Sequence, residues 1–165
     1  MTPAEIVARA MSQVGRPIRY ELGAGGRRWD LSTPAPSGAL DCSGFVAWCC
    51  GYDRGPRNTD WIVRDVNGAR AVFTRPLSPE PGDLVVYGGT FARVPVLRRI
   101  RPGHVGVVAE ALPAGEIWSG TREQWARIRV VHCSARNHRL PGGSAVAVTS
   151  GEIWARRGIV ARIKG

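Results

Sequence analysis

A cysteine opens a short apolar segment that is bounded at both ends, and this feature limits the possible folds more than any other. Asp41, Cys42 and Ser43 separate a Gly- and Pro-rich stretch from an apolar run. Counted from Cys42, apolar residues recur at the spacing of one helix face, at Phe45, Val46, Cys49 and Cys50. Asp41 or Ser43 is suited to cap the first turn, and Gly51 is suited to end the helix. The pattern therefore predicts a short helix that begins at Cys42.

The position of Cys42 at a helix N-terminus makes it a candidate nucleophile. The partial positive charge at that end of a helix favours thiolate over thiol. A nucleophilic cysteine also needs a base, and histidines follow downstream in the chain. The alternative for Cys42 is a plain core residue, which is the role we expect for Cys49, Cys50 and Cys133.

Length and composition indicate one globular domain over residues 1–165. A hydrophobic fraction of 44% is ordinary for a folded protein, and no apolar run approaches the ~18 residues that a membrane span requires. The chain lacks a charged segment followed by an apolar one at its start, so no signal peptide is expected in it. The four cysteines do not form a disulfide framework or a zinc-binding pattern, so no metal is expected.

The chain is strongly basic. Its formal net charge is +10, and Lys164 is the only lysine, so nearly all positive charge comes from arginine. A basic surface indicates an anionic partner such as a nucleic acid, a membrane surface or a wall polymer. Charge alone does not choose among these partners, and a basic surface without a specific role is also common.

Hydrophobic patterning predicts helices first and strands after them. Thr2 and Glu5 form a capping box for an amphipathic helix over about residues 3–14 that ends at Gly15. Thr59 is suited to cap a second helix, Asp60 to Asn67. The predicted strands cover residues 84–87, 104–109, 116–119, 128–133, 145–149 and 159–163. This order predicts an α+β fold, with an antiparallel sheet of about five or six strands and helices against one face.

Two of the three histidines lie on predicted strands. His104 follows a Pro-Gly turn and opens a strand, so its imidazole is placed to face a cleft. Alternation puts His132 on the opposite face from Val131 and Cys133. If the two strands are neighbours, the imidazoles meet on one face, where one ring serves as base for Cys42 and the other fixes its tautomer. His138 lies in a polar, Arg-rich stretch and is expected to be exposed.

At these residues the chain resembles the NlpC-type cell-wall cysteine peptidases of the papain-like superfamily. The resemblance covers most of the chain and rests on short motifs in the family's order. They are Gly-Arg-Pro-Ile-Arg-Tyr at 15–20 followed by Gly25-Gly26, Asp-Cys-Ser-Gly-Phe-Val at 41–46, Pro-Gly-Asp-Leu-Val at 81–85, His-Val-Gly-Val at 104–107, and Val-His-Cys at 131–133. Asp-Cys-Ser-Gly by itself is a moderate signal, whereas the ordered set is specific.

The resemblance implies a papain-like fold and a role for each matching residue. Cys42 is the nucleophile, His104 the general base and His132 the residue that orients it. Tyr20 matches a family tyrosine near the nucleophile, at the oxyanion or substrate pocket. Asp41 and Ser43 match positions that help to hold the amino end of the substrate, although plain helix capping explains both equally well. No metal or organic cofactor is implied.

The chain departs from the family pattern at three places. Ile18 and Arg19 are inserted before Tyr20, and 28 positions separate His104 from His132, more than a short hairpin needs. Residues 109–127 and 88–103 therefore resemble insertions that wall the cleft and set specificity. The second insertion brings four arginines toward the base, at positions 93, 98, 99 and 101.

The implied activity is hydrolysis of amide bonds in peptidoglycan stem peptides, usually the γ-D-glutamyl bond to a diamino acid. A muramoyl-alanine amidase, or a papain-like amidase, deamidase or acyltransferase acting on another amide, remains an alternative. Such an enzyme acts in the cell envelope, after delivery by a phage or a secretion apparatus or after loss of a leader; a delivery or immunity partner is left open. A nucleic-acid module, built from arginines and six tryptophans, is the other class, but no nucleic-acid motif accompanies them.

Overall fold

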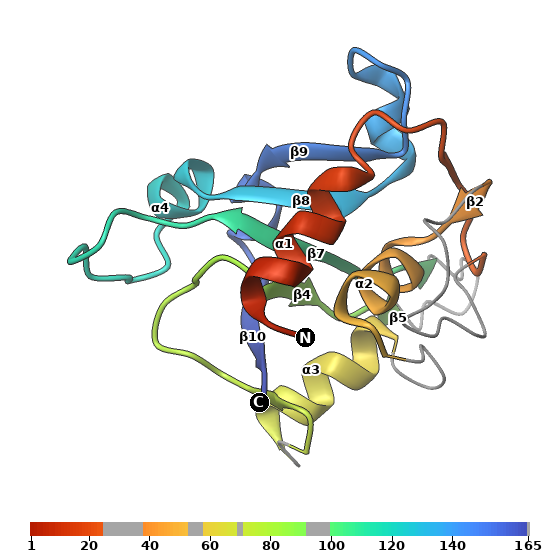
Figure 1. Ribbon diagram of the computed structural model, residues 1–165. Helices are drawn as coiled ribbons and strands as arrows, with labels where there is room; N and C mark the ends of the chain where they lie inside the picture. Colours follow the sequence, from red (N-terminus) through yellow and green to blue (C-terminus); the bar gives the residue numbers. More distant parts are fainter. Residues whose placement is uncertain (25–37, 53–57, 69–70, 92–99, 165) are drawn as a thin grey trace.

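The computed structural model describes residues 1–24, 38–52, 58–68, 71–91 and 100–164 (Figure 1). At its centre lies a six-stranded sheet in which every hydrogen-bonded pair of neighbours is antiparallel. In spatial order the strands are β3 (Phe73–Thr74), β10 (Ile159–Ile163), β4 (Leu84–Tyr87), β7 (His104–Glu110), β8 (Arg129–Cys133) and β9 (Val146–Ser150). The fold is therefore mixed α+β, as the sequence predicts.

Three helices begin at side chains that cap them. The capping box of Thr2 and Glu5 starts α1 (Pro3–Ser12), which ends earlier than predicted, with Gln13 as its C-cap. Asp41 caps α2 (Cys42–Cys50), and Gly51 ends it in the left-handed conformation with φ 66°. The cap of α3 (Thr59–Asn67) is Asn58 rather than the predicted Thr59, because the Asn58 side chain accepts the Trp61 N–H.

The helix that carries Cys42 is buried along its whole length. All nine residues of α2 are buried, and the helix packs with α1 on β7 and β8 (Figure 1). Phe45, Val46 and Cys49 contribute to a core that also includes Val107 and Val131 of the sheet. Burial on every side holds the start of α2 firmly against the strands.

A second core on the other face of the sheet corrects the expectation that helices cover one face only. Val85, Val108 and Val130 alternate away from the first core and pack with Trp125 and Trp154. Trp125 belongs to α4 (Arg122–Arg127) and Trp154 to the 3₁₀ helix η2 (Gly151–Trp154). The strand predicted at 116–119 is wrong, because these residues form no strand and Trp118 packs edge-on against Trp125.

The Pro-Gly-Asp motif at 81–83 forms a turn that packs against the start of α1 and binds Arg162 of β10. Gly82 has φ 93°, and a Cβ there would lie 2.6 Å from the Pro3 side chain at the start of α1. Asp83 accepts the Glu80 N–H at 2.8 Å and both Nε and Nη2 of Arg162 on β10. The turn therefore joins α1, β4 and β10, which explains why only glycine suits position 82.

Two small sheets and one 3₁₀ helix complete the description. The pair β1 (Arg19–Tyr20) and β2 (Ala39–Leu40) is parallel and ends just before α2, whereas β5 (Thr90–Phe91) and β6 (Ile100–Arg101) are antiparallel. The helix η1 (Ala135–Arg139) follows β8. Positions 25, 26, 93, 98 and 99, and the side chain of Arg101, lie outside the described residues. Among the described helices, none is long and apolar enough to cross a membrane.

Candidate active site

Cys42 occupies the first position of α2 beside the start of β7. Cys42 is 4% exposed, and the backbone amide of Val105, the residue after His104, interacts with its sulfur. Among the described residues, no hydrogen bond joins the thiol to His104. The structure thus brings the sulfur to the backbone of the strand that begins with the predicted base.

The two residues that flank Cys42 are engaged in the helix cap. Oδ1 of Asp41 accepts the Gly44 N–H at 2.7 Å and the Ser43 hydroxyl at 2.9 Å. Oδ2 accepts the Gly23 N–H at 3.0 Å, and both flanking side chains are buried. Asp41 is therefore the cap, whereas Ser43 lies within the helix and donates to the capping carboxylate. A role of either residue in holding substrate stays a prediction.

His104 and His132 meet on one face of the sheet, as the alternation predicts for neighbouring strands. Nε2 of His104 lies 2.7 Å from Nδ1 of His132, and the rings are nearly perpendicular. Gly106 makes this approach possible, since a Cβ there would lie 3.0 Å from the His132 Cβ and 2.6 Å from a Val130 methyl group. The glycine of the His-Val-Gly motif is therefore required by the packing of the histidine pair.

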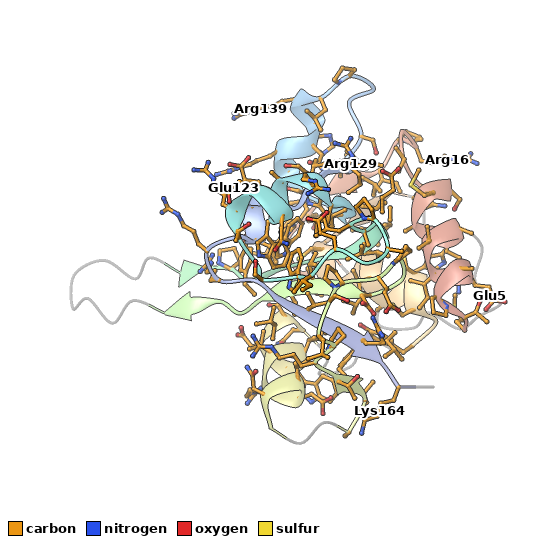
Figure 2. All side chains as sticks on the ribbon, turned by 90° about the vertical axis from the view of Figure 1, so that its left-hand side faces the viewer. Glu5, Arg16, Glu123, Arg129, Arg139 and Lys164 are labelled. Atoms are coloured by element: carbon orange, nitrogen blue, oxygen red, sulfur yellow. The ribbon has the colours of Figure 1, made fainter. Side chains whose placement is uncertain are left out.

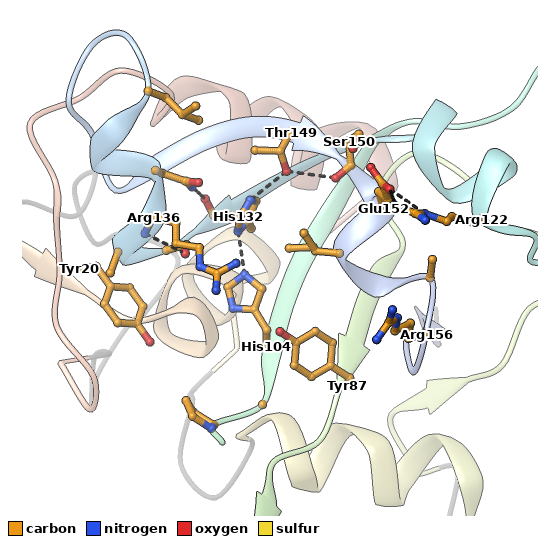
Figure 3. A pocket seen from close by; sticks show the side chains of 18 residues that line it. Tyr20, Tyr87, His104, Arg122, His132, Arg136, Thr149, Ser150, Glu152 and Arg156 are labelled. Atoms are coloured by element: carbon orange, nitrogen blue, oxygen red, sulfur yellow. Dashed lines mark hydrogen bonds and ion pairs between the residues drawn. The ribbon is translucent and has the colours of Figure 1, made fainter. Parts of the chain in front are cut away.

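A third residue, Thr149 on β9, extends the chain of hydrogen bonds and fixes its direction (Figure 3). The Thr149 hydroxyl donates to the Ser150 carbonyl at 3.2 Å, so it accepts from the Nε2–H of His132 at 3.0 Å. His132 therefore keeps Nδ1 unprotonated and accepts the Nε2–H of His104. It follows that Nδ1 of His104 carries a free lone pair, which is the form that a general base needs.

Trp154 shields the histidine pair from water. Its ring stacks on His104 with centroids 5.5 Å apart and meets His132 edge-on at 5.3 Å. Burial lowers the pKa of His104 to about 4, with a smaller contribution from Arg136, and lowers the pKa of His132 to about 3. Both rings are therefore neutral at pH 7, in agreement with the tautomers that the hydrogen bonds require.

The thiolate expected from the helix dipole is not the form that this environment favours. Burial raises the pKa of the Cys42 thiol to about 12, and the charge of Asp41 adds to the rise. The amides of Val105 and Ser43 act in the opposite direction but do not outweigh burial. In the free protein, Cys42 is therefore a thiol and His104 is neutral, so the two do not form an ion pair, and Cys42 packs in the first core while His104 stacks on Trp154 of the second.

Tyr20 lines the histidine pocket and also interacts with Cys42. Its side chain lines the same pocket as His104, and burial, with smaller contributions from Cys42 and Asp41, raises its pKa. Burial is the largest cause and brings the pKa of Tyr20 to about 12, so the phenol stays a hydrogen-bond donor. Its backbone N–H donates to His138 Nε2 at 3.2 Å, and the His138 Nδ1–H donates to the Gly143 carbonyl. His138 is exposed as predicted, yet it anchors β1.

The histidine pair opens into a pocket of about 790 Å³. His104, His132, Tyr20 and Tyr87 line it, and Cys42 is not part of the lining that the described residues form (Figure 3). Three arginines also line it, namely Arg122, Arg136 and Arg156. Arg122 lies within residues 109–127, so this segment contributes one side chain to the lining of the pocket. Within the described part of the chain, no cluster of histidine, cysteine or acidic side chains is arranged to hold a metal ion.

Several site residues carry no signal in the sequence. Thr149 belongs to an ordinary strand, and Trp154 repeats the Gly-Glu-Ile-Trp run of 115–118, although the two tryptophans have different surroundings. Arg136 is one of many arginines. The pairing of β8 with β9 brings Thr149 to the histidines, the return of the chain at η2 brings Trp154, and the position of η1 after β8 brings Arg136.

Replacing Thr149 by valine is expected to lower kcat, for the amide hydrolysis that the resemblance implies, by about tenfold to a hundredfold, because leaving a buried donor unpaired costs about 1–3 kcal/mol. Without its acceptor, Nε2–H of His132 no longer fixes the tautomer of His104. His132→Ala is expected to cause a partial loss for the same reason. Thr149→Ser is the matched control and should stay near the wild-type rate. If Thr149→Val and Thr149→Ser have equal rates, the Thr149 hydroxyl does not contribute to the relay.

Stability is expected to fall between pH 6.5 and about 4. Burial lowers the pKa of both histidines, so the unfolded chain takes up protons in this range while the folded protein does not. Stability is fully present above pH 6.5 and is lost as pH falls toward the folded values, by on the order of 3 kcal/mol per histidine. Urea unfolding at pH 7.5 and 4.5 measures the loss. The double variant His104→Gln/His132→Gln should lose less over the same interval, and an equal loss would contradict the assignment.

Comparison with protein-family models and with curated proteins finds no match to this chain.

Proposed function

We propose that this chain is a cysteine hydrolase, a papain-like peptidoglycan endopeptidase of the NlpC type. The observation that carries the proposal is the relay from Thr149 through His132 to His104. The relay leaves Nδ1 of His104 unprotonated. His104 is the first residue of β7, and the backbone amide of the next residue, Val105, interacts with the Cys42 sulfur. A thiol at a helix N-terminus, a base and a residue that orients the base are the parts that acyl transfer to sulfur requires.

The chemistry proceeds from a neutral thiol and imidazole. As the Cys42 sulfur attacks the carbonyl carbon of an amide, Nδ1 of His104 takes the thiol proton. The Tyr20 hydroxyl and the backbone N–H of Cys42 are the proposed donors to the oxyanion. His104 then gives the proton to the leaving amine, which departs from the acyl-enzyme. Water attacks the acyl carbon, His104 takes its proton, and the acid and the thiol are released.

Charge supports a wall polymer as the substrate. The net charge of +10 attracts a polyanion, and the pocket beside the histidines contains three arginines and one carboxylate, Glu152. The γ-D-glutamyl bond to a diamino acid is the proposed target, and the site of action is the cell envelope. The proposed mechanism needs no cofactor.

Digestion of purified peptidoglycan tests the proposal directly. We expect mass spectrometry to find new amino groups on the diamino acid and new carboxyl groups on glutamate. Cleavage between muramic acid and alanine would assign a muramoyl-alanine amidase instead. An intact polymer, under conditions where the protein is folded, would reject the wall substrate and favour an amidase, deamidase or acyltransferase that acts on another amide.

A further inference from the structure

The pocket beside the histidines carries positive charge that the described residues do not neutralise. Its charged lining consists of Arg122, Arg136, Arg156 and Glu152. The Glu152 carboxylate forms an ion pair with Arg122, which donates to it through two nitrogens. Neither Arg136 nor Arg156 makes a salt bridge within the described part of the chain. Two guanidinium groups therefore face the pocket without an acidic partner there.

Arg136 is the one of these two that lies at the catalytic histidines. Figure 3 shows its guanidinium beside the rings of His104 and His132. The helix η1 fixes the backbone of Arg136, whose N–H donates to the capping Ser134 hydroxyl at 3.3 Å, and the side chain is exposed. Its charge opposes protonation of His104. A cation beside a base hinders proton transfer unless something offsets it during the reaction.

We propose that Arg136 binds a carboxylate of the substrate, carried by the residue whose carbonyl is attacked. The proposal rests on the function proposed above and names a feature of its substrate. A guanidinium without an acidic partner in a pocket is suited to bind a carboxylate through two parallel N–H donors. The bound carboxylate offsets the charge that opposes protonation of His104. Substrate binding thereby makes His104 a stronger base.

The proposal distinguishes two forms of the same stem peptide. A γ-linked glutamate keeps a free α-carboxylate on the residue that supplies the scissile carbonyl. When that carboxylate is replaced by a carboxamide, the charge is lost while the shape is nearly kept. The enzyme should therefore prefer the acid form to the amide form.

Synthetic L-Ala-γ-D-Glu-diaminopimelate and its α-carboxamide analogue provide the test. Wild-type kcat/KM should be about tenfold to a hundredfold higher for the acid, the range expected for a charged hydrogen-bonded pair. Arg136→Gln should reduce this ratio to near one by slowing the acid form. Arg139→Gln is the matched control, since Arg139 lies on the same helix η1 and is exposed like Arg136, but it does not line the pocket and points away from the body of the protein (Figure 2). It should keep the wild-type ratio.

A binding measurement separates failure of this inference from failure of the proposed function. The γ-methylamides of N-acetyl-D-glutamate and N-acetyl-D-isoglutamine, which differ only in the α-carboxylate, serve as probes in calorimetry with Cys42→Ala, and the acid should bind about tenfold tighter. The Cys42→Ala/Arg136→Gln protein should lose this difference. If neither tripeptide is cut but the acid probe still binds tighter, the proposed hydrolase activity is rejected and the carboxylate-binding site is supported. If the tripeptides are cut at equal rates, or the two probes bind alike, the carboxylate site is rejected.

Discussion

Cys42→Ala is expected to abolish the proposed hydrolysis of purified peptidoglycan, with a loss of about four orders of magnitude or more, because Cys42 is proposed to supply the attacking atom. Folding should change little. The substitution removes one small buried atom at the start of α2, and Asp41 still caps the helix, so we expect ~1 kcal/mol of destabilisation. Release of muropeptides measures the activity, and urea unfolding measures the stability.

Cys50→Ala is the matched control for this experiment. Cys50 ends the same helix, is also buried, and burial also raises the pKa of its thiol to about 12. Its loss removes a sulfur of the same kind from the other end of the same element. Activity should survive in Cys50→Ala and vanish in Cys42→Ala. Hydrolysis by purified Cys42→Ala at more than a trace would show that the nucleophile lies elsewhere.

His104→Gln is expected to reduce turnover by about three orders of magnitude or more while the protein stays folded. The glutamine amide keeps a donor for Nδ1 of His132 but offers no basic nitrogen to the thiol. Because burial lowers the pKa of His104 to about 4, the wild-type rate should persist in mildly acidic solution, well below the ordinary histidine pKa of about 6.5. Only neutral His104 accepts the proton, so activity falls as pH drops through its pKa.

The pH profile also separates the base from a structural role. If His104 only supported the fold, activity would follow the fraction of folded protein measured by urea unfolding at each pH. As the base, it produces an acid limb in kcat/KM while the protein is still folded. A wild-type profile that falls near pH 6.5, or rapid hydrolysis by His104→Gln, would move the base to another residue.

Local signals in the sequence were sufficient for the elements that carry the predicted triad. The cap at Asp41, the apolar spacing after it and Gly51 predict α2 with its observed end. Alternation on β8 predicts that His132 turns away from Val131 and Cys133, and those two side chains do lie in the first core. Each of these features depends on residues a few positions apart, where periodicity and capping act directly.

Other elements have too few local signals to be predicted. The helix α4 buries a single residue, Trp125, so it shows no apolar periodicity. Strands β1 and β2 have two residues each, and it is their pairing that brings Tyr20 beside the start of α2. The direction of the pKa shift at Cys42 was also beyond local reasoning, since burial by the whole fold outweighs the dipole of one helix.

The amino-acid sequence alone was enough to place a cysteine at a helix start and two histidines on strands of an antiparallel sheet, because capping and alternation are short-range properties. The partners of those histidines follow from the fold. Thr149, Trp154 and Arg136 reach the pair through strand register, through the return of η2 across the second core and through the position of η1 after β8. Register and packing join residues that are distant in the chain, so the tautomer, the protonation state and the charge of the site emerge only when the chain is folded.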